Sequence, residues 1–238
     1  MAGRSGIARR AVRAFGGLLL AGLIVLIALQ CWYLGHIVWW KTHAPESTRF
    51  MREQLAVLRE HNPSAQLSYQ WVPYSRISPQ LKRAVIAAED ARFTDHEGVD
   101  WDAIEKAHER NQRRGKVTAG GSTITMQLAK NLFLTGERSY LRKAQELAIT
   151  FMLEAVLSKD RILELYLNVA EWGVGVFGCE AGARHLYGVP AERLSAAQAA
   201  RMAAMLPRPR FYDRNPGAPG LARRAAVIQR WMGSVQTP

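Results

Sequence analysis

An uncharged run at residues 14–40 constrains this chain more than any other feature of its sequence. As an α-helix its 27 residues would be about 40 Å long, whereas the hydrocarbon core of a bilayer is about 30 Å thick. The run therefore predicts a transmembrane anchor at 14–40. Four arginines lie before it: Arg4, Arg9, Arg10 and Arg13. Because positive residues favour the cytoplasmic side of a membrane, residues 1–13 are expected to form a cytoplasmic basic tail.

A cleaved signal peptide is the alternative to an anchor. The apolar part of such a peptide is about 7–15 residues long and precedes an Ala-x-Ala site, whereas this run is longer and no such site follows it. Aromatic residues typical of a membrane interface lie at its far end: Trp32, Tyr33, Trp39 and Trp40. We therefore expect a single-pass protein of the cell inner membrane, with a cytoplasmic N-terminus and a periplasmic domain.

The formal net charge of +12 and the sequence pI of about 10.2 favour an anionic partner. A domain outside the cytoplasm argues against nucleic acid and leaves membrane lipid or a phosphorylated substrate. The two cysteines do not fit a disulfide framework, because Cys31 lies inside the predicted anchor and Cys179 lies far beyond it. Cys179 is expected to be a small buried residue.

Hydrophobic periodicity predicts one mainly α domain at 66–238, joined to the anchor by a connecting helix within 41–65. An alternating stretch at 66–74 is expected to be extended, and the glycines between 173 and 178 predict a loop. A long helix at 139–157 is expected to bury an apolar stripe: Ala144, Ala148, Phe151, Met152 and Ala155.

Several helix boundaries have local signals. Ser78 followed by Pro79 is typical of a helix start, and that helix should end near Asp90. Gly188 should end a later helix. A capping box is expected at the start of a further helix, formed by Ser195 and Gln198.

Four blocks of the chain carry a specific order of polar residues. Residues 89–98 read E-D-A-R-F-T-D-H-E-G, residues 120–127 G-G-S-T-I-T-M-Q, residues 142–146 R-K-A-Q-E, and residues 159–168 K-D-R-I-L-E-L-Y-L-N. In this order they resemble the signatures of the peptidoglycan glycosyltransferases (glycosyltransferase family 51), although Met126 replaces the more common Gln. The resemblance implies a lysozyme-like α fold. It also implies polymerisation of lipid II, the lipid-linked disaccharide-peptide precursor of the cell wall.

The chemistry of such a reaction suits the residues present. A sugar hydroxyl that attacks an anomeric carbon needs a general base. A pyrophosphate leaves as a stable anion and needs cations, whereas a lysozyme-type hydrolase expels an alkoxide and needs a general acid. Glu89 is the candidate base, because the C-terminal end of its helix should raise its pKa. The alternative is an ordinary solvated carboxylate at a helix end.

The other candidate residues surround this base. Asp90 is expected to support the site by hydrogen bonding, Phe93 to pack, and His96 to fix the loop; the resemblance gives all three site-shaping roles. Lys130, Arg138, Arg142 and Lys143 are expected to form a pyrophosphate clamp, although each suits a solvated basic face as well. Neutral hydrogen-bonding groups for substrate are expected from three residues: Ser122, Thr123 and Gln127.

Glu146 is the second carboxylate. It lies three and four residues after Lys143 and Arg142, a spacing typical of a surface ion pair. The resemblance instead implies a catalytic auxiliary at the donor site, or a ligand for a divalent cation such as Mg²⁺ or Mn²⁺. No other cofactor is expected.

Apolar residues at 128–134 have two interpretations. They suit ordinary core packing, and they also suit a membrane-facing wall that admits the lipid tail. Residues 159–168 are expected to be mainly structural, with Ile162, Leu163, Tyr166 and Leu167 in the core.

Three functions compete. The first is a membrane-anchored glycan-strand polymerase that uses lipid II and the growing glycan chain, with membrane lipid and other cell-wall synthesis or division proteins as partners. It should have no transpeptidase activity, because no Ser-x-x-Lys nucleophile motif occurs and the chain ends at 238. The second is a lysozyme-like lytic enzyme. The third is a non-catalytic scaffold for cell-wall synthesis.

Overall fold

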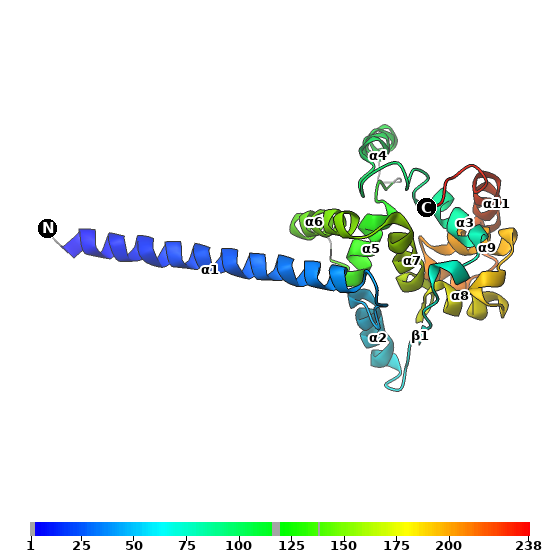
Figure 1. The fold of residues 1–238 in the computed structure, drawn as a ribbon, viewed down its shortest axis with the longest axis horizontal. Helices are drawn as coiled ribbons and strands as arrows, with labels where there is room; N and C mark the ends of the chain where they lie inside the picture. Colours follow the sequence, from blue (N-terminus) through cyan, green and yellow to red (C-terminus); the bar gives the residue numbers. More distant parts are fainter. Residues whose placement is uncertain (1–2, 116–119, 138) are drawn as a thin grey trace.

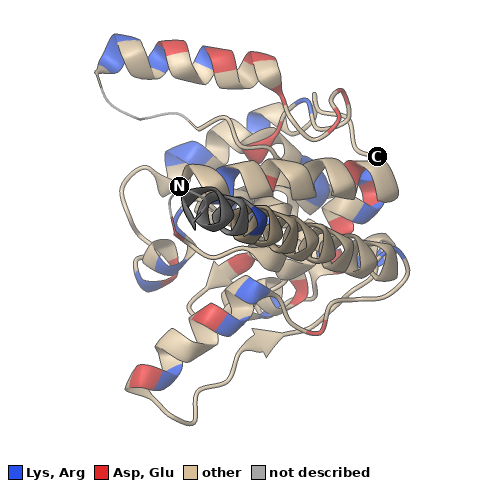
Figure 2. Ribbon diagram, turned by 90° about the vertical axis from the view of Figure 1, so that its left-hand side faces the viewer, with Lys and Arg blue, Asp and Glu red and all other residues tan. Residues whose placement is uncertain are grey.

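The N-terminal helix α1 runs from Gly3 to Trp39 and projects from the rest of the molecule as a single rod (Figure 1). The structure is a computed structural model that describes residues 3–115, 120–137 and 139–238. Within α1, the segment Arg13–Trp39 is long and apolar enough to cross a membrane. The most apolar window of this segment has no buried residue. Figure 2, viewed from the N-terminal end of α1, shows no charged residue along most of the rod. The prediction of one N-terminal helix with this capacity is confirmed.

The domain that follows is mainly helical, as predicted. Its α-helices in the described residues are α2 (Arg49–His61), α3 (Pro79–Glu89), α4 (Trp101–Arg114), α5 (Ile124–Phe133), α6 (Tyr140–Val156), α7 (Lys159–Val169), α8 (Cys179–Tyr187), α9 (Ala196–Met205), α10 (Pro209–Arg214) and α11 (Leu221–Trp231). Two short 3₁₀ turns accompany them, η1 (Tyr74–Arg76) and η2 (Ala191–Arg193).

Local capping sets several of these boundaries. The Ser78 hydroxyl accepts a hydrogen bond from the backbone N–H of Gln80, and Pro79 occupies the first turn of α3. Ser195 and Gln198 form the predicted capping box of α9. Gly188 ends α8 with a φ of +67°, in the left-handed region that favours glycine.

A small sheet lies beside the helices, with strands β1 (Ser68–Tyr69), β2 (Glu171–Gly173) and β3 (Val176–Phe177). Its order is β1-β3-β2, with β1 parallel and β2 antiparallel to β3. The extended stretch predicted at 66–74 is therefore confirmed at Ser68–Tyr69, whereas Tyr74 begins the 3₁₀ turn η1. The loop predicted around 173–178 is wrong: a hairpin forms there, and Gly175 supplies a φ of +70° at its turn.

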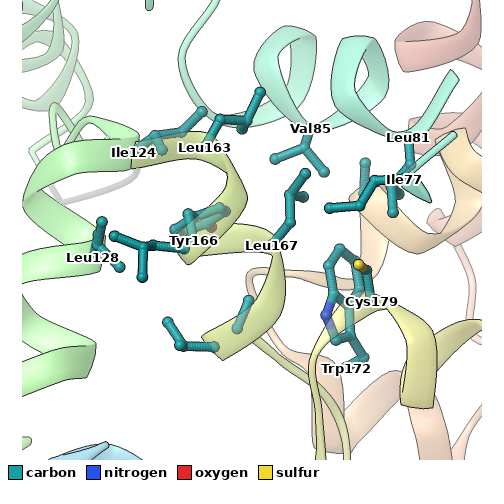
Figure 3. Packing of buried hydrophobic residues seen from close by; sticks show 14 of the residues in the cluster. Ile77, Leu81, Val85, Ile124, Leu128, Leu163, Tyr166, Leu167, Trp172 and Cys179 are labelled. Carbon is teal, nitrogen blue, oxygen red and sulfur yellow. The ribbon is translucent and has the colours of Figure 1, made fainter. Parts of the chain in front are cut away.

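The core of the domain is centred on α7. Every residue at 162–169 is buried, so this helix is covered on all sides. Figure 3 shows side chains of α3 and α5 pointing at α7, with Leu163, Tyr166 and Leu167 between them. Cys179 is buried in the same cluster, as predicted.

The end of α1 is docked on this domain. Tyr33, Ile37 and Trp40 are buried, and the ring of Phe133 lies 4.9 Å from that of Tyr33 and 5.1 Å from that of Trp40. Three neighbours of Phe133 in the predicted membrane-facing wall are also buried: Leu128, Leu132 and Leu134. The wall hypothesis is therefore wrong for these residues, which pack in the core.

The predicted buried stripe of α6 is wrong for three of its five residues, whereas Ala148 and Met152 are partly buried. Phe151 is 49% exposed, and Ala144 and Ala155 are also exposed. The buried face consists of Glu146, Ile149, Thr150 and Leu153. Two of these four are polar, and both have internal partners: Glu146 contacts cations, and the Thr150 hydroxyl donates to the Glu146 carbonyl oxygen. As a result, α6 carries an exposed apolar face, which begins with Tyr140 (97% exposed) and Leu141 (85% exposed).

Candidate active site

Glu89 is the last residue of α3, and its side chain is only 12% exposed. Its Oε2 accepts a hydrogen bond of 2.9 Å from the Gln127 amide. Its Oε1 has no hydrogen-bond donor among the described residues, and the Arg224 guanidinium lies 3.6 Å away. Burial raises the pKa of Glu89, against the opposing effects of Gln127 and Arg224. The direction agrees with the sequence-based expectation, but its main cause is burial.

Gln127 is itself oriented by a buried tyrosine. The Tyr166 hydroxyl, on α7, donates to Gln127 Oε1 at 3.0 Å, which leaves the amide nitrogen to face Glu89. Tyr166 is fully buried, and burial raises the pKa of its hydroxyl well above the usual value. It therefore stays a neutral donor. Sequence reasoning gave Tyr166 only a packing role and missed this one.

The loop after Glu89 is tied to the start of α5. Asp90 Oδ2 accepts a 3.0 Å hydrogen bond from the backbone N–H of Ile124, and Asp90 Oδ1 lies 2.9 Å from His96 Nε2. The Thr123 hydroxyl donates to the carbonyl oxygen of Gly98 at 2.6 Å and accepts from the N–H of Met126. These contacts connect the first two sequence blocks.

The same contacts place the remaining residues of these blocks. Phe93 is buried, and the Lys159 ammonium lies 4.7 Å from the centre of its ring. Ser122 is exposed, whereas the Thr123 hydroxyl is already occupied by backbone groups. Met126 is buried in the core, so its difference from the usual Gln lies away from the cleft.

Loss of the Asp90 carboxylate is expected to destabilise the domain. An Asp90→Ala variant leaves the Ile124 N–H and the His96 ring without their partner, which should lower the free energy of unfolding by about 1–3 kcal/mol. The melting temperature in detergent should fall by roughly 2–12 °C. Asp95→Ala, an exposed position in the same loop, is the matched control. Equal melting temperatures for the two variants would contradict this role.

Glu146 is not part of a surface ion pair, because it is 4% exposed. Its two oxygens accept hydrogen bonds from Arg142 and Lys143. Lys130, on the neighbouring helix α5, is half-buried; burial lowers its pKa, and the nearby Glu146 carboxylate opposes that shift. Three members of the predicted clamp are therefore grouped around one buried carboxylate. The fourth, Arg138, lies outside the described residues.

A cleft runs past these groups. One cavity of about 400 Å³ is lined by Gln127, Lys130 and Tyr166, and by residues 206–211 opposite them. A second cavity of about 240 Å³ shares Lys130 and continues to Arg142. Glu89 lies one hydrogen bond behind Gln127. The cleft therefore extends from Gln127, the partner of the buried Glu89, to a cationic group at Lys130 and Arg142.

The match to known proteins covers the same elements. A transglycosylase family profile matches residues 55–232. The chain belongs to the peptidoglycan transglycosylase family. It is 59% identical over 221 residues to a biosynthetic peptidoglycan transglycosylase of Herminiimonas arsenicoxydans. The aligned region covers 93% of this chain and 96% of that protein. Proteins of the same description from Bordetella pertussis (57%; 95% of each chain) and Chromobacterium violaceum (56%; 92% of this chain and 97% of the other) are also similar. The family resemblance is thereby confirmed.

Residues of α2 and α10 also line the cleft of this transglycosylase family member, and a residue of α11 faces the candidate base. Phe50 of α2, within the predicted connecting segment, lines both cavities. Arg210 donates to both oxygens of Glu171 at 2.8 and 3.0 Å, and Arg224 faces Glu89. The sequence around Arg224 is basic, and this local signal does not reveal Glu89 as its partner.

Among the described residues, two carboxylate groups were candidates for a divalent cation, and the oxygens of both already have partners. Both Glu146 oxygens are occupied by cationic donors. Asp90, His96 and Asp100 have ligand atoms within 4.8 Å of one another, but both Asp90 oxygens already have partners. Both Asp100 oxygens bind Arg92.

Proposed function

We propose that this chain polymerises peptidoglycan glycan strands from lipid II. In this reaction Glu89 removes the proton from the sugar hydroxyl of lipid II. The hydroxyl oxygen then bonds to the anomeric carbon of the growing lipid-linked strand, while the bond from that carbon to the pyrophosphate oxygen breaks. The proton stays on Glu89, and undecaprenyl pyrophosphate leaves as an anion. The observation that carries the proposal is a buried Glu89 with a raised pKa beside a cleft that ends in cations.

The cationic end of the cleft favours transfer over lysis. Lys130, Arg142 and Lys143 can neutralise a departing pyrophosphate without giving it a proton. A lytic enzyme needs a second carboxyl group that donates one. Two further buried carboxylates lie near this cleft, Glu146 and Glu171, and both oxygens of each accept hydrogen bonds from cationic side chains. Because these oxygens already bind cations, we infer an electrostatic role for Glu146, in which it holds Arg142 and Lys143 together.

Incubation of the purified full-length chain with lipid II in detergent tests this function. Glycan polymer resolved by gel electrophoresis is the expected product. Release of muropeptides from purified cell wall would favour the lytic enzyme instead. A folded protein that is inert in both assays would favour the scaffold.

The pH dependence of polymerisation should report Glu89. A general base works only when deprotonated, and burial raises its pKa above the usual 4.5. Activity should therefore be full above the raised pKa and fall about tenfold per pH unit below it. The measurement is kcat/KM from pH 4 to 8.5, which reports the free enzyme. A profile that stays flat down to pH 4.5 would contradict the raised pKa.

We further propose that the domain works on the periplasmic face of an inner membrane, with the N-terminus in the cytoplasm. The arginines before the apolar segment support this orientation, and the exposed apolar face of α6, next to α1, supports contact with the bilayer. The chain should extend glycan strands without cross-linking them, because it has no Ser-x-x-Lys motif. Other cell-wall proteins stay predicted partners.

A further inference from the structure

A pair of glutamine side chains links the anchor to the domain. The Gln30 amide of α1 donates to Gln145 of α6 at 3.0 Å, and the Gln145 amide donates back to Gln30 at 3.0 Å. Each amide is thus donor and acceptor to the other. In Figure 1, α6 lies beside α1 and reaches further back along it than the other labelled helices of the domain.

The position of Gln30 along the membrane-crossing segment makes this pair unusual. Gln30 belongs to the segment that can cross a membrane. It lies about 24 Å along the helix from Ala14, at about 1.5 Å per residue, whereas the hydrocarbon core is about 30 Å thick. Gln30 therefore lies within the outer part of that core or at its edge. An amide there has little water to bind, so an unpaired one is unfavourable and a paired one holds two helices together.

A second contact fixes the end of the anchor. The Arg161 guanidinium, on α7, donates to the carbonyl oxygens of Trp40 at 2.8 Å and His43 at 2.6 Å. Gln30 lies ten residues before Trp40, or about 15 Å back along α1. Two attachment points at this separation determine the direction of α1 relative to the domain. Without the Gln30 contact, α1 would be held only nearer its C-terminal end, by Arg161 and by the buried Tyr33, Ile37 and Trp40.

Both helices that carry the clamp touch α1. Phe133, at the end of α5, packs on Tyr33, and α5 also carries Lys130. Gln145 is the immediate neighbour of Glu146, the residue that holds Arg142 and Lys143 together. A shift of α6 along α1 would therefore move two cations of the clamp with it.

We propose that Gln30 is a positioning residue of the site. Its amide pair with Gln145 holds α6, and thereby Arg142, at the depth where the pyrophosphate of a membrane-bound substrate lies. The inference rests on the proposed function, because it takes a lipid-linked pyrophosphate as the ligand of the clamp. The anchor is on this account a part of the site's architecture as well as a tether.

Kinetics of a Gln30→Leu variant test the proposal. In proteoliposomes with long-chain lipid II, KM should rise about tenfold while kcat stays within twofold, because chemistry at Glu89 is untouched. With a short-chain, water-soluble lipid II analogue in detergent, both constants should stay within twofold. The Gln145→Leu variant, and the variant that carries both Gln30→Leu and Gln145→Leu, should behave like Gln30→Leu alone, since the two amides act as a unit. Leu29→Ala, an exposed neighbour on α1, is the control and should match the wild type.

The depth of α6 in the membrane can also be measured without enzymatic turnover. A bimane label at Tyr140→Cys, with Cys31→Ser to remove the exposed native thiol, reports the start of α6 through quenching by spin-labelled lipids. Gln30→Leu should reduce quenching by an acyl-chain spin label at least twofold. An unchanged quenching ratio would overturn the proposal, and so would equal loss of activity on the two substrates. If the wild type failed to polymerise lipid II, the proposed function would fail while the quenching result still decided the role of Gln30.

Discussion

Replacement of Glu89 by glutamine is expected to lower the initial rate of lipid II polymerisation by about 10²–10⁴-fold, the usual contribution of a general base. Glutamine keeps the size of the side chain and its hydrogen bond with Gln127, but it cannot accept a proton. The measurement is glycan formation by purified protein in detergent. Glu97→Gln, an exposed carboxylate in the same block, is the matched control and should keep the wild-type rate.

Thermal unfolding separates this effect from misfolding. Burial raises the folded-state pKa of Glu89, so the folded protein bears a cost for the charged carboxylate above that pKa and none below the unfolded value near 4.5. Glu89→Gln removes this cost and should melt at or above the wild-type temperature at pH 7.5. The gain should vanish near pH 4. A melting temperature well below the wild type at pH 7.5 would contradict the assignment of Glu89 as a buried base.

Features with local causes could be predicted from the sequence. The membrane-length helix follows from an uninterrupted lack of charge, and the start of α3 from the cap made by Ser78 and Pro79. The family follows from four blocks of ordered polar residues. The raised pKa of Glu89 was predicted in direction, but from its place at a helix end. Its burial depends on α5 and α11, which the sequence alone does not bring to it.

The buried face of α6 could not be predicted, and the reason is specific. A periodicity argument places apolar residues inside, but α6 buries Glu146 and Thr150 and exposes Phe151. Polar residues are stable inside only when paired, and the partners of Glu146 are visible only once the helix is packed. Exposed apolar residues are stable beside a bilayer, which a rule derived for soluble helices does not include.

Contacts between distant segments were also beyond sequence reasoning. Arg224 lies 135 residues after Glu89, and Gln145 lies 115 residues after Gln30. No local pattern marks either pair. They exist because α11 and α1 pack against the helices that carry the first and third sequence blocks.

Replacement of Lys130 by methionine is expected to lower kcat/KM for lipid II by about 10²–10³-fold, as loss of one preorganised charge-stabilising group does elsewhere. Lys130 lines both cavities of the cleft, and among the described residues no carboxylate lies within ion-pairing distance of its ammonium group. Burial lowers its pKa, which means that the charged form is held at a cost in the free protein. A departing pyrophosphate would supply the missing counter-charge.

The cost of keeping Lys130 charged in the free protein separates a catalytic role of this residue from a role in folding. If Lys130 serves only folding, methionine should reduce both stability and activity. If it serves the leaving group, Lys130→Met should melt at or above the wild-type temperature, because a half-buried charge without an ion-pair partner is gone, while activity is lost. Lys130→Arg should recover part of the rate, since it restores the charge with a different geometry. Lys106→Met, on the exposed face of α4, controls for the loss of one positive charge. Comparable activity in Lys130→Met and Lys106→Met would remove Lys130 from the clamp.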